Sequence, residues 1–329
     1  MKKLIFFLFI ALNIILFISC DDNVNPKTDL KDVYALNCVI RGDTSLQVAT
    51  ITRSYNVDGF DPLTNSDDPF IKGARIKLFY QSTGETFIFR DTSMVRPEGS
   101  RYSTPMNYYY IKNFRPAYES PISIEAILPN GKVLSAKSMA LFISRYVIED
   151  KYYTIPVPNF GGKYLNFSWS AVTPSTKDEK VYYVPELIIQ YAKVQNGSSI
   201  ELQKKVPLYY ISGRDGEFPL YPSIQSNITS VSFDTLTIRR SLEEISTGDP
   251  NKQNYIVNKA VFRLLITDRN LAVYYAAQKT FLDEFSVRVT QPEFTNINGG
   301  LGIFGTLNST QMNVPIKPEY IRKFGYKPF

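Results

Sequence analysis

The sequence predicts an all-β protein, mainly antiparallel, organised as two β-sandwich-like domains. Two observations support this prediction. Apolar and polar residues alternate with a period of two in short runs, as they do in strands that bury one face. Turn-forming residues separate the runs, and residues 129–132 supply the asparagine and glycine of a tight hairpin turn. Many short amphipathic strands of this kind pack as an antiparallel sandwich.

The first predicted domain covers residues 33–145 and is immunoglobulin-like. Between residues 74 and 80, Ile76 and Leu78 face one way while Arg75 and Lys77 face the other. A second alternating run ends at the 129–132 turn, and a partner strand follows it. The strand candidates of this domain are 33–40, 46–53, 74–80, 86–90, 108–112, 122–128 and 133–136.

The second predicted domain covers residues 146–329. A stretch rich in proline and glycine, about 145–163, connects it to the first domain. Its strand candidates are 164–170, 181–194, 206–211, 230–238 and 261–267. Trp169, the single tryptophan, lies inside an alternating strand and is expected in the core.

One helix is predicted in the second domain, near residues 269–283. Asp268 can cap it, because a side-chain oxygen at that position accepts a hydrogen bond from a free backbone N–H of the first turn. The face predicted from helical spacing consists of Leu271, Tyr274, Tyr275, Gln278, Phe281 and Leu282. We expect this face to dock on the sheet of the second domain rather than on a membrane.

The N-terminus has the pattern of a lipoprotein signal peptide in residues 1–19. Two lysines and an apolar run from residue 4 to 17 are followed by the small Ser19 and then by Cys20. Cys20 is therefore the predicted lipidation site, and residues 20–32 form a lipid-bearing polar tether. The alternative is a retained transmembrane helix, although the apolar run is shorter than the about 20 residues needed to span hydrocarbon.

Composition argues against several functional classes. The 37 basic and 31 acidic residues give a formal net charge of +6, and they are dispersed, which does not indicate nucleic-acid binding. There is no histidine, so histidine-dependent triads and histidine-containing zinc sites are excluded. The motifs Gly-x-Ser-x-Gly, Ser-x-x-Lys and Gly-x-x-x-x-Gly-Lys are missing too. We therefore predict no catalytic residue, no cofactor and no metal site, and only carboxylate chemistry stays open to an enzyme.

Cys38 is the only cysteine besides Cys20, so no internal disulfide is predicted. It shares an alternating strand face with Leu36 and Ile40. In that position a free thiol behaves as a small apolar residue, and we expect Cys38 to be buried rather than reactive.

Several segments together resemble a known family. They are Leu36-Asn37-Cys38-Val39-Ile40, Ile71-Lys72-Gly73-Ala74-Arg75-Ile76, Tyr274-Tyr275 and the glycine-rich residues 294–305. With the predicted lipid-bearing cysteine, they resemble the domain-of-unknown-function 4249 family of Bacteroidota lipoproteins over nearly all of the mature chain. The resemblance implies an outer-membrane lipoprotein, often encoded beside a TonB-dependent receptor, with no established activity. It also implies that Asp21 and Asp22 act as a surface-export signal, so the protein would face outward.

Residues 300–305 match the pattern Gly-x-Gly-x-x-Gly, but we do not interpret them as a dinucleotide site. That motif needs a preceding strand, a following helix and a later acidic residue within a βαβ unit. Here Pro315 and Pro318 intervene before the sequence stops. We expect the glycines to allow positive φ or close backbone approach in a turn between late strands.

Two further groups have both a structural and a functional interpretation. Residues 56–61, followed by Asp67 and Asp68, form the densest oxygen cluster, but their spacing fits no calcium loop and favours a solvated acidic loop. The tyrosines at 108–110 and 209–210 could stack on sugar rings. Adjacent strand residues point to opposite faces, so at least one tyrosine of each set is expected in a core.

Three functional hypotheses follow. The leading one is a non-catalytic surface lipoprotein, anchored through Cys20, that serves as an accessory or assembly partner of a TonB-dependent receptor. The second is a glycan- or peptide-binding module for nutrient capture, suggested by the abundance of tyrosine. The third is a carboxylate-dependent hydrolase, because two suitably spaced carboxyl groups suffice for glycoside cleavage.

Overall fold

The computed structural model describes residues 32–55, 61–65, 67–102, 104–116, 119–142, 148–149, 163–170, 180–213, 216–279 and 294–329. Strands dominate this part of the chain, and nearly all strand pairs are antiparallel. The predicted all-β, mainly antiparallel class is therefore confirmed. The predicted signal peptide, Cys20 and nearly all of the tether lie outside the described residues.

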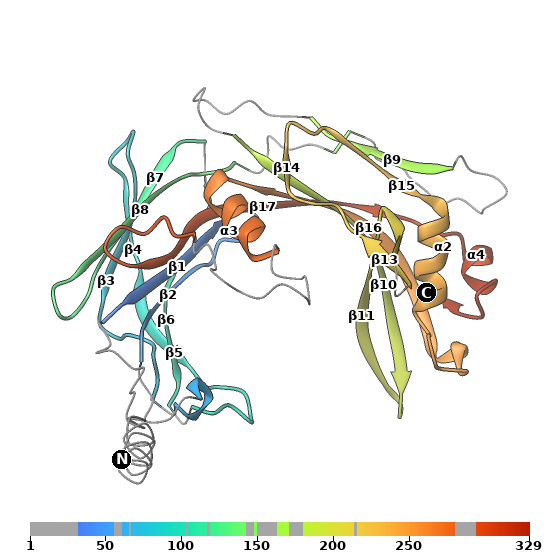
Figure 1. The fold of residues 1–329 in the computed structure, drawn as a ribbon, viewed down its shortest axis with the longest axis horizontal. Helices are drawn as coiled ribbons and strands as arrows, with labels where there is room; N and C mark the ends of the chain where they lie inside the picture. The colour runs from blue at the N-terminus through green and yellow to red at the C-terminus, as the bar shows by residue number, and fades with distance from the viewer. Residues whose placement is uncertain are drawn as a thin grey trace, which may run out of the picture. The chain divides into compact units, whose positions relative to one another are not determined.

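The largest sheet has ten strands (Figure 1). Its main path runs in the order β11, β10, β16, β17, β1, β2, β6 and β5, while β14 pairs with β10 and β18 pairs with β16. The bounds along this order are β11 Ser198–Val206, β10 Tyr182–Gln195, β16 Tyr255–Thr267, β17 Leu301–Val314, β1 Tyr34–Arg41, β2 Gln47–Arg53, β6 Met106–Ile111, β5 Arg90–Met94, β14 Gln225–Ser226 and β18 Lys327–Pro328.

Three smaller sheets complete the strands. A four-stranded sheet contains β4 (Thr86–Ile88), β3 (Arg75–Tyr80), β7 (Pro121–Ile127) and β8 (Val133–Met139), in that order. The two others are hairpin-sized pairs: β9 (Tyr164–Ser168) with β15 (Ser230–Asp234), and β12 (Tyr209–Gly213) with β13 (Gly216–Leu220).

Two hydrophobic cores show which sheets pack against one another. In the first core, Leu36 and Ile51 of the large sheet pack in one buried cluster with Ile76 and Ile124 of the four-stranded sheet. The alternation that predicted strands in this region therefore places one residue in two in the interior, as in a sandwich. Cys38 is buried in the same cluster, as predicted.

The second core is rich in aromatic residues. Phe167 of β9 stacks on Phe262 of β16 with ring centroids 4.1 Å apart, and Phe233 of β15 meets Phe167 edge-on. Trp169 is 1% exposed and lies beside Tyr183, which confirms its predicted place in the core. The β9–β15 pair thus covers the large sheet with aromatic side chains.

The last long strand contributes to both cores. β17 pairs in parallel with β1, where Cys38 lies opposite Phe304, and Phe304 is buried in the first core. Farther along, β17 pairs with β16, and its final residue Val314 is buried in the second core. The predicted division into 33–145 and 146–329 therefore does not describe β17, and the predicted boundary itself falls outside the described residues.

A small separate unit consists of residues 1–32 and 54–65, of which only a few are described. It contains the 3-10 helix η1 (Pro62–Thr64). The carboxylate of Asp61 accepts a hydrogen bond from the backbone N–H of Leu63 at 2.8 Å. Asp61 therefore caps a local turn.

Three α-helices occur in the described part of the chain, where one was predicted. They are α2 (Thr235–Glu244), α3 (Arg269–Lys279) and α4 (Pro318–Arg322), together with the 3-10 helix η3 (Lys252–Asn254). α3 is the predicted helix, and its expected continuation to residue 283 lies outside the described residues. The prediction of a strand over 230–238 was wrong in its second half, because β15 ends at Asp234 and α2 begins at the next residue.

Asp268 caps α3 as predicted and also ties it to two strands. Its Oδ1 accepts hydrogen bonds from the backbone N–H groups of Leu271, at 3.1 Å, and of Thr306 in β17, at 3.2 Å. Its Oδ2 accepts one from the hydroxyl of Ser138 in β8, at 2.5 Å. The helix therefore packs beside β17, a strand within the predicted second domain, at the part of β17 that pairs with β1.

The glycine-rich block forms a turn and then a strand. Gly299 lies in the turn with a φ of 82°, but Gly302 and Gly305 are inside β17. Beside them, the side chain of Asn296 imitates a neighbouring strand, since its Oδ1 accepts from the N–H of Phe304 at 2.9 Å and its Nδ2 donates to the carbonyl of Phe304 at 2.7 Å. This is no nucleotide loop, because a strand follows the glycines where that motif needs a helix.

Candidate functional site

The predicted oxygen cluster does not form a cation site in the part that is described. Residues 56–60 lie outside the described residues. The carboxylate of Asp68 pairs with the guanidinium of Arg96 at 2.9 Å and accepts hydrogen bonds from Phe70 N–H and the Thr104 hydroxyl. Burial raises the pKa of Asp68, but these hydrogen bonds and the charge of Arg96 outweigh it, so the pKa lies below its usual value. Asp68 therefore holds two loops together.

The first tyrosine set behaves as predicted. Tyr109 is fully buried, and its hydroxyl donates to the carbonyl of Ile71 at 2.8 Å and accepts from the N–H of Ala74 at 3.1 Å. Tyr108 and Tyr110 project from the opposite face of β6 with their rings 6.3 Å apart. One tyrosine is therefore core and the other two are partly accessible.

The second tyrosine set differs from the prediction, because neither member is in a core. The predicted strand over 206–211 is interrupted: β11 ends at Val206 and β12 begins at Tyr209. β12 then pairs with β13 as a hairpin, with Tyr209 opposite Leu220 and Ile211 opposite Phe218. The sequence Gly213-Arg214-Asp215-Gly216 is a turn signal that could have revealed this hairpin.

One face of the β12–β13 hairpin is apolar and open to solvent. We call Tyr209, Ile211 and Phe218 the hairpin face; their exposed fractions are 51%, 47% and 53%. Cross-strand pairing puts Ile211 and Phe218 side by side. The ring of Phe218 also lies over Gly213, where a Cβ would come within 2.7 Å of it. Glycine at this position therefore leaves room for the aromatic ring, which a Cβ would displace.

The opposite face of the hairpin is fixed to α2. The guanidinium of Arg240 lies 3.6 Å from the ring centroid of Tyr210 and pairs with Glu217 of β13 at 2.5 Å. The hydroxyl of Tyr210 donates to Glu244 at 3.0 Å, and Lys204 of β11 pairs with Glu244 at 2.7 Å. Burial first, and then the hydrogen bond to Glu244, raises the pKa of Tyr210 to about 12. The hydroxyl therefore stays protonated and keeps donating at neutral pH.

The hairpin therefore presents an apolar outer face on a backbone that α2 holds in place. Cation–π contact, hydrogen bonding and ion pairing all act on the inner face, so the hairpin is held by several interactions at once. The outer face carries large side chains with no covering partner among the described residues. Exposed aromatic and aliphatic side chains on a fixed backbone are typical of surfaces that bind other molecules.

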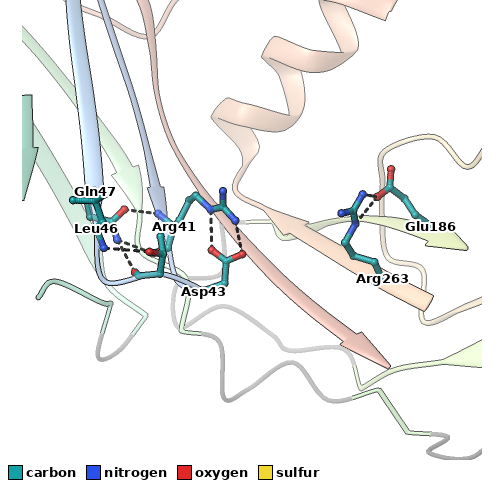
Figure 2. Close-up of polar contacts among 7 residues, drawn as sticks. Arg41, Asp43, Leu46, Gln47, Glu186 and Arg263 are labelled. Carbon is teal, nitrogen blue, oxygen red and sulfur yellow. Dashed lines mark hydrogen bonds and ion pairs between the residues drawn. The ribbon is translucent and has the colours of Figure 1, made fainter. Parts of the chain in front are cut away.

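Figure 2 shows two polar contacts that stabilise the large sheet rather than bind a ligand. The amide of Gln47 accepts from the N–H of Arg41 and donates to its carbonyl, both at 2.8 Å, which closes the β1–β2 connection. Glu186 of β10 pairs with Arg263 of β16 at 2.6 Å. It also pairs with Lys205 of β11 at 2.6 Å. Burial raises the pKa of Glu186. The hydrogen bonds and charges of Lys205 and Arg263 lower it by more, so the pKa lies below its usual value. Glu186 therefore links three adjacent strands as a charged carboxylate.

Among the described residues, no three side chains of the types His, Cys, Asp or Glu gather in a way that could hold a metal ion. No helix in the described ranges combines the length and the apolar character that crossing a membrane requires. The remaining thiol, Cys38, is buried, and burial raises its pKa, so it has little thiolate character.

Comparison with known proteins adds no identification. No family model matches the sequence, and no curated protein matches it. The crystal structure of DIP-gamma IG1+IG2 is similar to this chain at 8% sequence identity, with 88% of this chain and 99% of that chain covered and a TM-score of 0.18. A TM-score this low carries no argument about the fold or the function.

Proposed function

We propose that this chain is a non-catalytic lipoprotein of the outer membrane, anchored by lipid on Cys20 and facing outward, that binds a TonB-dependent receptor as an accessory or assembly partner. The proposed location is supported by the signal-peptide pattern and by the family resemblance. The contact surface in this proposal is the hairpin face. One observation carries the proposal: three large apolar side chains stand exposed on a hairpin whose other face is fixed to α2.

The energetics of the hairpin face favour a protein partner. Burying one large apolar side chain contributes about 1.5–3 kcal/mol, and aromatic residues supply much of the energy at protein interfaces. Ordering a flexible loop would reduce this gain, but the Tyr210 and Arg240 contacts already order the hairpin. The charged side chains of the hairpin lie on the opposite face, toward α2, so the hairpin face itself is apolar. A partner with a complementary apolar patch is therefore the best fit.

The test is a pull-down of the tagged mature protein from gently solubilised outer membranes. We expect a TonB-dependent receptor to co-purify in stoichiometric amount with the wild-type protein. Ile211→Ser should reduce its recovery about tenfold, since one buried apolar contact is lost. Ile200→Ser is the matched control, because Ile200 of β11 is 48% exposed against 47% for Ile211. Cys20→Ala tests the anchor separately and should leave unprocessed precursor without lipid.

Three outcomes would each contradict one part of the proposal. A wild-type protein that purifies alone would remove the receptor partnership. Equal recovery of the receptor with Ile211→Ser and with wild type would move the contact surface away from the hairpin face. Normal lipid labelling of Cys20→Ala would refute the anchor without affecting the other two conclusions.

A specific observation also favours the second candidate, glycan binding. Phe218 is exposed beside Gly213, and Tyr209 and Tyr221 are exposed nearby in sequence on the same hairpin and its exit. Flat aromatic faces stack on sugar rings. In a glycan-binding screen, Phe218→Leu should abolish binding because the ring is lost, whereas Ile211→Ser should leave it nearly unchanged. The receptor proposal predicts the reverse sensitivity for Ile211.

A further inference from the structure

A cavity of about 550 Å³ lies where the start of α3 meets the end of β8. It is separate from the hairpin face, and it belongs to the junction that Asp268 and Asn296 hold together. Its volume is within the range of small-molecule sites, about 300–1,000 Å³. The residues that line it are Pro121, Lys137, Ser138, Met139, Asp268, Arg269, Asn270, Val273, Phe294 and Asn296.

The acidic and amide side chains that line the cavity already make hydrogen bonds within the protein. Both carboxylate oxygens of Asp268 accept hydrogen bonds from protein donors, and Asp268 is 2% exposed. The amide of Asn270 donates to the carbonyl of Lys137 at 2.9 Å. The amide of Asn296 is paired with the backbone of Phe304. These groups shape the cavity with hydrogen bonds that are already made, and the carboxylate of Asp268 contributes one negative charge to the wall.

The two cationic side chains that line the cavity, unlike these groups, have no partner among the described residues. Lys137 of β8 and Arg269 of α3 both line the cavity and are solvent-exposed. No carboxylate among the described residues lies within ion-pair distance of either side chain. They come from different elements and approach the same cavity, so their charges add there. These two positive charges exceed the single negative charge of Asp268, so the cavity wall is net positive and favours an anion.

The remaining wall is apolar. Met139 is buried, and Val273 and Phe294 are half-buried and face the same space. A small inorganic anion would leave this surface in contact with water. A ligand with one negative group and an apolar body would satisfy the cations and cover the apolar wall at once.

We infer that this cavity binds a small amphipathic carboxylate, whose charged group pairs with Lys137 and Arg269 and whose apolar body lies against Met139, Val273 and Phe294. The inference is independent of the proposed receptor partnership, because the cavity and the hairpin face share no residue. The carboxylate is the better match of the charged group, since the Arg269 guanidinium can engage both of its oxygens.

The experiment is calorimetric titration of the full mature protein with octanoate and, in parallel, with 1-octanol. Octanoate should bind saturably at one site, and octanol, which has the same chain but no charge, should bind about tenfold more weakly. Lys137→Gln and Arg269→Gln should each weaken octanoate binding about three- to tenfold and leave octanol binding unchanged. Lys72→Gln, which removes an exposed lysine away from the cavity, is the control and should behave as wild type.

Val273→Gln tests the apolar wall and should weaken both ligands. The Lys137 and Arg269 side chains are exposed and bond no described residue, so thermal unfolding of these two variants should match wild type and exclude a folding defect. Three results would overturn the inference: no saturable octanoate binding, equal affinity for octanol, or octanoate affinity unchanged in both cation variants. Loss of the receptor interaction would not bear on any of them.

Discussion

At the residue scale, Gly302 shows why one glycine in β17 cannot be replaced. Its φ is 110°, and a Cβ at this position would lie 2.1 Å from the carbonyl oxygen of Leu36 in the neighbouring β1. The sequence predicted positive φ or close backbone approach in this block, and Gly302 has both. It placed them in a turn, however, because a pairing between β1 and β17 leaves no local signal in either segment.

Gly302→Ala should therefore destabilise the protein by more than about 3 kcal/mol, since backbone strain and a steric clash add. Gly84→Ala is the control: Gly84 also has positive φ, 72°, but nothing lies within 4 Å of its Cβ position. Strain alone should cost about 1 kcal/mol there. Urea unfolding of both variants measures the difference, and equal losses would show that the contact with Leu36 is not tight.

The tyrosines at 209 and 210 show a second limit at this scale. Alternation correctly indicates that neighbours point to opposite faces, but it cannot say whether either face is covered. The ring of Tyr210 packs against the guanidinium of Arg240 in α2, whereas Tyr209 is exposed to solvent. The exposed hairpin face could not be predicted, because it depends on where α2 packs.

At the scale of elements, turn residues and helix caps in the sequence correctly predicted the hairpin and the helix that they form. The hairpin between β7 and β8 follows from its turn, in which Gly131 has a φ of 83° and the N–H of Leu128 donates to the carbonyl of Lys132. α3 follows from its cap Asp268. α2 was missed because Leu236 and Ile238 alternate with Thr235 and Thr237, which resembles a continued strand, although the buried residues Ile238 and Leu242 have helical spacing.

Asp234 is the residue that turns β15 into α2, and it provides the test of this explanation. Its carboxylate accepts from the N–H of Leu236 at 2.8 Å, as an N-cap does. Asp234→Ala should lower the free energy of unfolding by about 1 kcal/mol. Glu243→Ala on the exposed side of the same helix removes only an ion pair with Arg239 and should cost about 0.3–0.5 kcal/mol. Thermal or urea unfolding that ranks them in the opposite order would argue against the cap.

At the scale of the whole molecule, composition and alternation predicted the class, and pairing between distant segments determined the arrangement. A strand that completes two cores cannot be assigned to either from its own sequence. β17 carries apolar residues for both, with Phe304 buried in one core and Val314 in the other.

A fragment containing only residues 33–142 should therefore not unfold cooperatively, because β1 lacks its parallel partner and the core lacks Phe304. The same fragment joined by a flexible linker to residues 294–314 should recover a cooperative transition. Circular dichroism during urea unfolding distinguishes the two. A fragment of 33–142 that unfolds as sharply as the extended one would show that the first sandwich is self-sufficient.

The pairing of β1 with β17 also has a consequence for the order of events in folding. β1 is synthesised near the start of the described chain and β17 near its end, so their contact has a very high contact order and closes slowly. Until β17 has been made, one edge of β1 has no partner and can template association between chains. The nascent protein can therefore complete this strand pair only after β17 has been synthesised, and the open edge of β1 has to be kept from other chains until then.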